Sequence, residues 1–329
     1  MIYLESPGVN PAFNLALEQF VFDEMDRSQD YFMLWQNDNA VIVGKNQNTA
    51  EEIDSNYVRE HNIRVVRRLS GGGAGYHDLG NLNFTFITGA GNVSQMDRHA
   101  FNRPIIKALS RLGAEALCNG RNDMTIAGGK FSGSSQYIRG GRILHHGTLL
   151  FDSDLSVLSR CLNVSQDKLS SKGIRSVRSR VTNIRPHLKE DLTFSQFRAV
   201  FLRFLGEEFS FRPYRFTEEE LSRVREIQAA RYDRPEWNYG PSFGGCLKKE
   251  QRLEGCGKIQ AVMEVKEGCL SRIAFCGDFF GSASLNDLTN RLQGCPLNRE
   301  SLLAALSGLD LEPYIHGLKA PQLIRLLLS

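Results

Sequence analysis

The sequence predicts an α+β fold divided between two domains. Its 329 residues exceed the length of most single domains, which run from about 50 to 250 residues. Hydrophobic residues make up 41% and charged residues 23% of the chain, as in globular proteins that bury a substantial core. Strand-like alternation and helix-like spacing follow one another in mixed order, which favours α+β over a regular βαβ repeat.

A helix and three strands are expected in the first 90 residues. Asn10 can cap a helix that starts at Pro11, and apolar residues then recur at helical spacing. Apolar runs of strand length follow at 40–43, 63–66 and 82–86. In the third run the apolar residues alternate with Asn83 and Thr85, so one face of the predicted sheet is polar.

The middle of the chain continues with helices and a strand. Residues 103–112 have helical spacing and stop before Gly113, whereas residues 142–151 alternate as a strand. Two capping boxes begin further helices, namely Thr193 with Gln196 and Thr217 with Glu220.

A turn-rich stretch at 239–245 separates two regions of different character, and we place a domain boundary there. Five of the seven cysteines lie beyond it, residues 259–265 alternate as a strand, and helical apolar sets begin at Leu285 and Leu302. We expect a first domain over residues 1–245 and a smaller second domain over residues 250–329.

The charge balance and the cysteines exclude several classes of protein. The net charge of +3 gives no general attraction to nucleic acid or to anionic membranes. The first basic residue is Arg27, so no secretory signal is expected, and no apolar run approaches the roughly 20 residues of a membrane span. The cysteines are odd in number and lack a CxxC pair, which argues against disulfides or a thiolate zinc site. We expect a cytoplasmic protein with reduced thiols that binds neither nucleic acid nor membrane.

The densest group of candidate site residues is RRLSGGGAGYHDLGN at 67–81. Its three adjacent glycines can direct successive N–H groups at an anion or a carbonyl, and Arg68 can add a charged contact. Glycine richness alone would also suit a flexible hairpin loop, but the flanking arginine, serine, histidine and asparagine favour a binding loop. The segment contains neither Gly-Lys-Ser/Thr nor GxGxxG, which excludes the Walker loop and the Rossmann fingerprint here.

Two further groups carry polar residues in unusual settings. Lys130 stands between glycines and small hydroxyl residues, where a mobile turn would let its ammonium reach an oxyanion or a phosphate. A solvated turn lysine explains the same residues equally well. The segment HHGT at 145–148 lacks both HExxH spacing and a thiolate partner, so we favour hydrogen bonding over zinc binding there.

Seven basic residues and no acidic residue lie between Lys168 and Lys189. This segment suits a solvated loop, a mobile loop that closes over a polyphosphate, or an RNA-binding segment. RNA is disfavoured because the segment lacks aromatic residues on which bases stack. We expect residues 168–182 to become ordered over an anionic ligand.

Taken together, these motifs resemble the lipoate-protein ligase family, in family order and over nearly the whole chain. They are RRxSGGGAxYHDxGN at 67–81, GRND at 120–123, KxSGS at 130–134, HHGTLL at 145–150, KGIxSVRSRVTN at 172–183 and GDFF at 277–280. The last motif resembles part of the family's C-terminal accessory domain. At Gly75 the family usually has valine, a departure expected to loosen the loop that shapes the acyl pocket.

The resemblance implies a biotin/lipoate ligase-like catalytic domain with mixed β-sheets flanked by helices, followed by a small α+β accessory domain. It also implies two reaction steps: lipoate and ATP give lipoyl-AMP and pyrophosphate, and the lipoyl group then passes to a lysine of a lipoyl domain. ATP and Mg²⁺ are the implied cofactors. The implied acceptors are the acyltransferase subunits of 2-oxoacid dehydrogenases and the glycine cleavage H protein.

The resemblance also assigns roles to residues by their place in the family's motifs. Lys130 would be the catalytic residue that holds the acyl oxygen and the α-phosphate, and Asp123 would place Mg²⁺. Lipoate would contact Trp35, Arg68, Ser70, Gly72, His77 and Asn83. ATP or the adenylate would contact Gly73, Ala74, Gly75, Asn81, Asn122, Asp123, Lys130, Ser132, His146, Thr148, Lys172, Arg178 and Arg180.

Two alternative functions stay open at this point. One is an ATP-independent lipoyl or octanoyl transferase of the same fold, without an accessory domain and with a nucleophile such as Cys118 or Cys161. Cys161 falls in an apolar helical set, which favours a role in the core. The other is a protein that binds lipoate or its adenylate without turnover, and the presence of Lys130 argues against it.

Overall fold

The chain forms two compact units. The computed structural model describes residues 1–91, 99–119, 122–163, 181–240 and 247–329. The larger unit comprises Met1–Ile42, Ala50–Arg67 and Gly75–Asn238. The smaller unit comprises Val43–Thr49, Arg68–Ala74 and Tyr239–Ser329, so two short segments from the first quarter of the sequence group with its C-terminal part.

A mixed eight-stranded sheet is the centre of the larger unit. Its strands, in spatial order, are β11 (Arg212–Pro213), β1 (Ile2–Glu5), β2 (Tyr31–Trp35), β6 (Asn81–Gly89), β10 (Arg142–Leu150), β9 (Gly129–Arg139), β8 (Asp123–Ile126) and β7 (Ala116–Asn119). β1 runs parallel to β2 and β11, whereas the pairs from β2 to β7 are antiparallel. A second sheet has the order β4 (Arg64–Arg67), β3 (Ala40–Val43), β5 (Gly75–His77).

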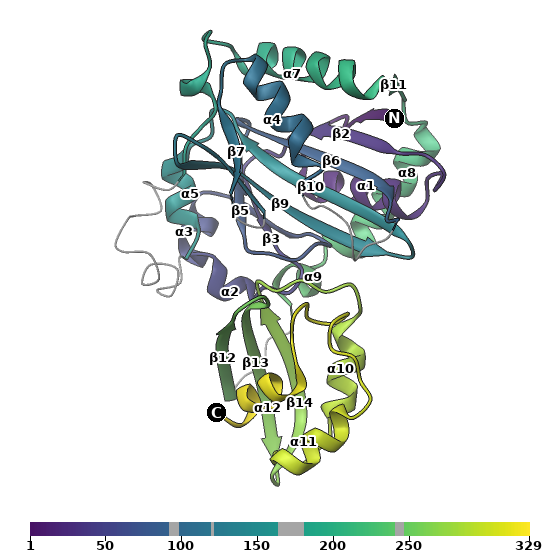
Figure 1. Cartoon of the computed structure of the whole chain (residues 1–329), viewed down its shortest axis with the longest axis vertical. Coiled ribbons are helices and arrows are strands. Elements are labelled where there is room, and N and C mark those ends of the chain that lie inside the picture. The colour runs from purple at the N-terminus through teal and green to yellow at the C-terminus, as the bar shows by residue number, and fades with distance from the viewer. Residues whose placement is uncertain (92–98, 120–121, 164–180, 241–246) are drawn as a thin grey trace. The chain divides into compact units, whose positions relative to one another are not determined.

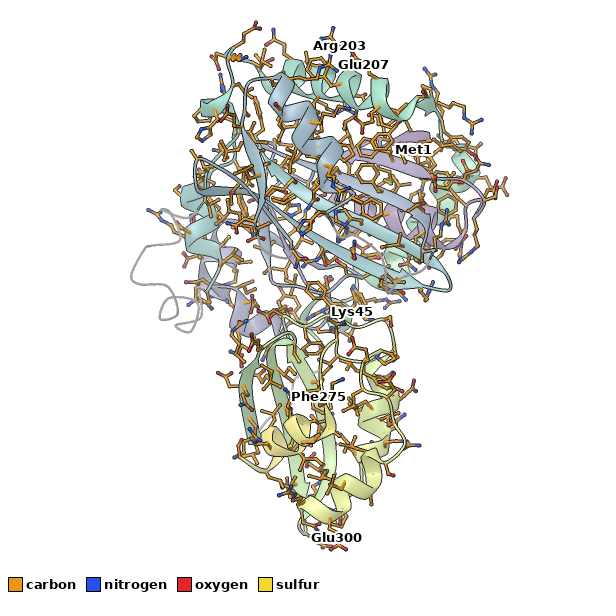
Figure 2. All side chains as sticks on the ribbon, viewed as in Figure 1. Met1, Lys45, Arg203, Glu207, Phe275 and Glu300 are labelled. Carbon is orange, nitrogen blue, oxygen red and sulfur yellow. The ribbon has the colours of Figure 1, made fainter. Side chains whose placement is uncertain are left out.

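Helices cover the large sheet and connect its strands. They are α1 (Pro11–Asp23), α2 (Thr49–Glu52), α3 (Ser55–Glu60), α4 (Asn102–Arg111), α5 (Leu155–Cys161), the 3₁₀ turn η3 (Arg185–His187), α7 (Phe194–Phe209), α8 (Glu218–Ile227), the π turn η4 (Gln228–Tyr232) and α9 (Pro235–Tyr239). Helices α4 and α7 lie over one face of the sheet (Figure 1). On α7, Phe197, Phe201 and Leu205 are buried against the sheet, whereas Arg203 and Glu207 face solvent (Figure 2).

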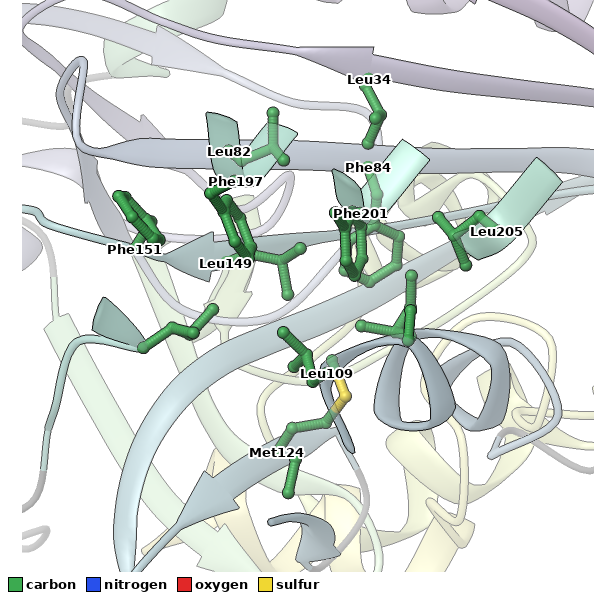
Figure 3. Packing of buried hydrophobic residues seen from close by; sticks show 14 of the residues in the cluster. Leu34, Leu82, Phe84, Leu109, Met124, Leu149, Phe151, Phe197, Phe201 and Leu205 are labelled. Atoms are coloured by element: carbon green, nitrogen blue, oxygen red, sulfur yellow. The ribbon is translucent and has the colours of Figure 1, made fainter. Parts of the chain in front are cut away.

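The main core lies between the large sheet and helices α4 and α7. Alternate residues of β6, Leu82, Phe84 and Phe86, point into it and leave the intervening polar residues on the opposite face. Within it the rings of Phe151 and Phe197 stack, with ring centroids 4.4 Å apart (Figure 3). Burying a side chain of this size contributes about 1.5 to 3 kcal/mol, so this face is chiefly a source of stability.

Helix α1 is fixed at both ends by polar contacts. The Asn10 side chain accepts from the backbone N–H groups of Ala12 and Phe13. At the other end Arg142 of β10 is 1% exposed and donates to the backbone carbonyls of Val21 and Phe22, at 3.0 and 2.7 Å. A guanidinium at a helix C-terminus satisfies carbonyls that have no partner within the helix and complements the helix dipole.

Most predicted elements of the larger unit are confirmed. The helix from Pro11, the three strands, the helix before Gly113 and the strand from Arg142 appear as α1, β3, β4, β6, α4 and β10. Both capping boxes are present, at Thr193 and at Thr217. Asn83 and Thr85 are buried on one face of β6, which confirms the predicted polar face of the sheet.

The smaller unit has a three-stranded antiparallel sheet covered by helices. Its elements are β12 (Leu247–Leu253), β13 (Gly257–Lys266), β14 (Cys269–Gly277), α10 (Leu285–Leu292), α11 (Arg299–Leu306) and α12 (Ala320–Leu328). Phe275 belongs to its core (Figure 2). A turn at Glu267 and Gly268, with φ of 50° and 75°, joins β13 to β14. Helix α12 was not expected from the sequence.

The structure confirms one expectation about burial. Cys161 is buried in α5, and burial raises the pKa of its thiol to about 12, which confirms a core role rather than a nucleophile. Among the helices of the described ranges, none has both the length and the apolar character needed to span a bilayer.

Candidate active site

A row of paired residues crosses five strands on the polar side of the large sheet. Trp35 of β2 pairs with Asn83 of β6, and Asn83 pairs with Thr148 of β10. The Thr148 hydroxyl accepts from the backbone N–H of Gly133 on β9, at 3.2 Å, and Gly133 pairs with Asp123 of β8. At about 4.8 Å per strand the row is about 19 Å long. Strand register therefore aligns residues from three separate sequence motifs with Trp35 and Asn83.

Lys130 and Asp123 form an ion pair at one end of this row. Lys130 Nζ lies 2.7 Å from Asp123 Oδ1, and both side chains are less than half exposed. A Cβ on Gly133 would stand 3.2 Å from the ammonium nitrogen, so the glycine leaves room for the lysine beside the strand. Because carboxylate and ammonium hold each other here, each is positioned before any ligand arrives.

The expectation of a mobile turn around Lys130 is wrong. The turn lies earlier, at Ala127 and Gly128, whose φ angles are 48° and 80°. Lys130 is the second residue of β9 and pairs with Thr125 beside a bulge. Its carbonyl also accepts from the N–H of Thr182, at 2.9 Å. Extended backbone bonded on both sides fixes the Cα of Lys130, so only its side chain is free to move.

Buried amide groups beside the row have unused hydrogen-bonding capacity. Asn81 Nδ2 donates to Asn83 Oδ1 at 3.0 Å. Within the described residues, Asn81 Oδ1 and Asn83 Nδ2 are buried and have no partner. Ser132 Oγ is also unpaired, but Ser132 pairs with the core residue Met124 and therefore faces the core side of the sheet. An unpaired buried polar atom costs about 1 to 3 kcal/mol, so a ligand that pairs with the two amide atoms would gain from them.

Glu18 of α1 joins two of the predicted site residues. Its carboxylate accepts from the Thr85 hydroxyl at 2.7 Å, and Thr85 accepts from the Trp35 indole N–H at 2.9 Å. His146 Nδ1 lies 2.8 Å from one carboxylate oxygen of Glu18 and 3.0 Å from the other. Glu18 is 2% exposed, so this carboxylate is wholly engaged within the protein.

His77 is held by a second chain of buried amides. The Asn14 side-chain amide donates to Asn37 Oδ1 at 3.0 Å, and Asn37 Nδ2 lies 3.2 Å from His77 Nδ1. Because the asparagine amide nitrogen is a donor, His77 Nδ1 is the acceptor and its proton is on Nε2. The ring of His77, on β5, thus has a defined tautomer.

The glycine-rich loop 68–74, in the smaller unit, is organised by its own arginine. Arg68 donates to Ser70 Oγ at 3.1 Å and to the carbonyls of Gly71 and Gly73 at 2.7 and 2.9 Å. Gly72 has a φ of 90°, and its carbonyl accepts from Gln47 Nε2 at 3.3 Å. The guanidinium therefore closes the loop into one conformation.

The segment before this loop packs directly against it. A Cβ on Gly44 would stand 1.9 Å from the Gly72 carbonyl oxygen, so only glycine allows this approach. Lys45 N–H donates to the Ser70 carbonyl at 2.8 Å, and Gly277 N–H donates to the Asn46 carbonyl at 2.7 Å. The conformation of the loop thus depends on a backbone contact with residues 43–49.

The adjacent Arg67 has a structural task in the larger unit. It is 4% exposed and donates to the backbone carbonyls of Trp237 and Asn238 at 2.7 and 3.1 Å. In return, Trp237 Nε1 donates to the Arg67 carbonyl at 2.8 Å. The two arginines of the motif therefore differ: Arg67 anchors a strand, and Arg68 shapes the loop.

His145 lies away from the polar row and is also structural. Its ring nitrogens lie 3.2 Å from Asn102 Oδ1 and 3.1 Å from Gln136 Nε2, and its ring stacks on Phe101. Burial, with a smaller contribution from His146, lowers the pKa of His145 to about 3. No group of three or more potential metal-ligating residues occurs in the described ranges.

The depressed pKa of His145 makes stability depend on acidity. The unfolded chain takes up this proton near pH 6.5 and the folded chain only near pH 3, so stability falls as the pH drops through that window. Urea unfolding at pH 7 and at pH 4.5 measures how much the free energy of unfolding falls between the two values. In His145→Gln this fall should be about 2 to 3 kcal/mol smaller than in the unmodified chain. Equal losses would contradict the assignment.

The remaining predicted residues are placed as follows. Asn122 accepts from the N–H of Ser134 at 2.8 Å through its carbonyl, next to Asp123. Gly75 starts β5 and pairs with Ile42, so it is held in a strand. Ala74 ends the glycine-rich loop. Lys172, Arg178 and Arg180, with most of the basic segment, lie outside the described residues.

Several residues of the site were missed by the sequence reasoning. Glu18, Thr85 and Asn37 lie within the hydrogen-bonded groups, and Gly44 lies against the loop. A signal existed for the helix: Asn14 and Glu18 are polar, four residues apart and surrounded by apolar residues. Polar residues at that spacing share one helix face, which here is buried.

Comparisons with known proteins agree with this arrangement. A family model described as the lipoyl protein ligase A/B catalytic domain matches residues 10–206, and one described as the bacterial lipoate protein ligase C-terminus matches residues 246–327. The chain is 41% identical over 318 residues to the lipoate-protein ligase LplJ of Bacillus subtilis, covering 95% of this chain and 96% of that protein.

Solved structures show the same likeness. A bi-partite lipoate protein ligase from Thermoplasma acidophilum, described together with its E2 lipoyl domain, is 31% identical with a TM-score of 0.64. That match covers 73% of this chain and 95% of the other. A lipoate-protein ligase A bound with ATP is 28% identical with a TM-score of 0.62, covering 73% of this chain and 97% of the other.

Proposed function

The chain belongs to the lipoate-protein ligase family, and we propose that it activates lipoate with ATP and transfers the lipoyl group to a lysine of a lipoyl domain. It is an enzyme with the biotin/lipoate ligase-like α+β fold. ATP as substrate is supported by the ATP-bound relative, and a lipoyl domain as acceptor by the relative described with one. The glycine cleavage H protein is a second acceptor that we propose from the sequence resemblance.

The reaction proceeds through a mixed anhydride. A lipoate carboxylate oxygen attacks the α-phosphorus of ATP, and pyrophosphate leaves with the electron pair of the broken P–O bond. The acceptor lysine, as a neutral amine, then attacks the acyl carbon, AMP leaves, and the amine loses a proton as the amide forms. Activation is needed because a free carboxylate would have to expel oxide.

The observation that carries this proposal is the row from Trp35 to Asp123, with Lys130 at its polar end. An ammonium held beside a carboxylate can move onto the acyl oxygen and the α-phosphate, where negative charge develops. Around 19 Å of row accommodates an acyl chain and a nucleotide end to end. We assign lipoate to the residues near Trp35 and the adenylate to those near Lys130.

The other assignments follow the same division. For lipoate we propose the residues that the sequence resemblance names, Trp35, Arg68, Ser70, Gly72, His77 and Asn83. For the adenylate we propose Asn81, Asn122, Asp123, Lys130, Ser132, His146 and Thr148, with Gly73, Ala74 and Gly75. The unpaired atoms of Asn81 and Asn83 support these choices, because they offer hydrogen bonds to a ligand.

Asp123 fits the magnesium role that the family implies. Mg²⁺ is usually bound through one or two carboxylates together with substrate phosphates, so it needs no cluster of protein ligands. Asp123 supplies such a carboxylate next to Lys130. When bound, the ion would neutralise charge on the phosphates of ATP, and Asp123 would hold it.

One assay separates the three candidate functions. The chain is incubated with lipoate, ATP and an apo lipoyl domain, and both pyrophosphate and lipoylated acceptor are measured. A ligase releases pyrophosphate with lipoate and ATP alone and modifies the acceptor when it is added. Acceptor modification from an acylated donor without ATP would indicate a transferase, and binding without either product would indicate a sensor or carrier.

We propose domain boundaries at 1–245 and 250–329, with the second domain supporting adenylation. Phe279 and Phe280 pack against Gly71, and Gly277 bonds to Asn46, so the C-terminal residues hold the glycine-rich loop. A fragment of residues 1–245 should therefore fail to form lipoyl-AMP from ATP yet transfer lipoate from preformed lipoyl-AMP. Equal activity in both half-reactions would show that the domain is dispensable. A folded fragment inactive in both would place acceptor binding there.

A further inference from the structure

A buried carboxylate connects the two ends of the proposed substrate site. Glu18, Thr85 and His146 are 2%, 0% and 7% exposed, and all three lie on the polar side of the large sheet. Trp35, assigned to lipoate, is reached from Glu18 through the Thr85 hydroxyl. His146, assigned to the adenylate, is reached from Glu18 directly. None of the family motifs in the sequence includes Glu18.

The directions of these hydrogen bonds are fixed by chemistry. An indole N–H can only donate, so Thr85 Oγ accepts from Trp35 and donates its own O–H to Glu18. A carboxylate can only accept, so His146 Nδ1 carries a proton toward Glu18. One anion thus sets the orientation of the indole and the tautomer of the imidazole.

We propose that Glu18 is a positioning residue that orients Trp35 for lipoate and holds His146 in the Nδ1-protonated tautomer for the adenylate. The proposal rests on the proposed function, because it concerns the same two ligands. A buried carboxylate that loses its donors is strongly unfavourable, so both partners are held tightly. Glu18 touches neither reacting group and acts only through these two side chains.

Substitution of Glu18 by leucine tests the tautomer. Glu18 Oε1 accepts from Thr85 and also lies 2.8 Å from His146 Nδ1, so a glutamine oxygen could keep both contacts, whereas leucine removes every acceptor. An N–H on Nδ1 would then be buried without an acceptor, so the proton of His146 should shift to Nε2. Imidazole ¹⁵N NMR on the full chain reports this shift directly. The chain has seven histidines, and comparison with His146→Gln identifies the signal.

Substitution of Thr85 tests the contact with Trp35 separately from the contact with His146. Thr85→Val keeps the shape of the side chain but removes the acceptor of the Trp35 indole, so the lipoate KM should rise about tenfold. The ATP KM and the His146 tautomer should stay as they are. Thr85→Ser restores the hydroxyl and should restore the lipoate KM. With only two tryptophans in the chain, the indole ¹H–¹⁵N signal of Trp35 confirms the lost bond.

Glu18→Leu, in contrast, should raise the KM for both lipoate and ATP by about tenfold. Glu60→Leu, on α3, is the control for a carboxylate replaced elsewhere and should change neither constant. An unchanged His146 tautomer in Glu18→Leu, or equal effects of Thr85→Val on both substrates, would overturn the proposal. The NMR signals need no turnover, so they test Glu18 even if the unmodified chain released no pyrophosphate, a result that would refute the proposed function alone.

Discussion

Replacing Lys130 by alanine should slow pyrophosphate release by about 10²- to 10³-fold, the usual cost of removing one group that stabilises transition-state charge. The variant should remain folded, because the Lys130–Asp123 ion pair is about two-fifths exposed and such pairs contribute about 0 to 1 kcal/mol. Initial rates of pyrophosphate release with lipoate and ATP, and the melting temperature, are the two measurements.

A matched control distinguishes loss of this ammonium from loss of any positive charge. Lys107 of α4, which covers the face of the large sheet opposite the polar row, pairs with Glu208 at the surface, and Lys107→Ala should leave the rate unchanged. Asp123→Asn should keep the ammonium but remove its partner and the proposed magnesium ligand, so it should impair release without abolishing it. Near-normal release by Lys130→Ala would reject the catalytic role.

Gly44→Ala should weaken lipoate binding about 100-fold, although Gly44 lies outside every motif that resembles the family. The new Cβ would stand 1.9 Å from the Gly72 carbonyl oxygen, and backbone at this distance must move. Displacing Gly72 also disturbs the loop that Arg68 holds through the carbonyls of Gly71 and Gly73. Misplacement of binding groups by about 1 Å commonly costs about 10²-fold.

Calorimetric titration of lipoate into the full chain measures this effect. Gly89→Ala is the control, since a Cβ there meets nothing within 4 Å and should leave the affinity unchanged. Circular dichroism on both variants checks that the effect is not a loss of folding. Unaltered lipoate affinity in Gly44→Ala would show that the loop does not contribute to the lipoate site.

Local features of the fold were predictable from the sequence. The cap at Asn10, the capping boxes at Thr193 and Thr217 and the alternation in β6 depend on neighbours within a few residues. The prediction of a turn at Lys130 was wrong because glycines at 128 and 129 also suit a tight hairpin followed by a strand. Local composition does not say where such a hairpin ends.

The site was predictable only in part, because its other half is built from distant residues. The motif residues stand out in the sequence by their types and spacing. Glu18, however, meets Thr85 across 67 positions and His146 across 128, and Gly44 meets Gly72 through backbone alone. Contacts of this kind arise from strand order and register, which no single sequence segment encodes.

The anchoring of α1 to β10 constrains which changes of length the protein can tolerate. Arg142 binds the carbonyls at the end of the helix, and His146 of the same strand binds Glu18 within it. Inserting or deleting one residue between Glu18 and Phe22 would rotate Glu18 by about 100° away from Thr85 if Arg142 kept its hydrogen bonds to the end of the helix. Indels in relatives should therefore cluster outside residues 14–22, and pocket redesign should leave that span ungapped.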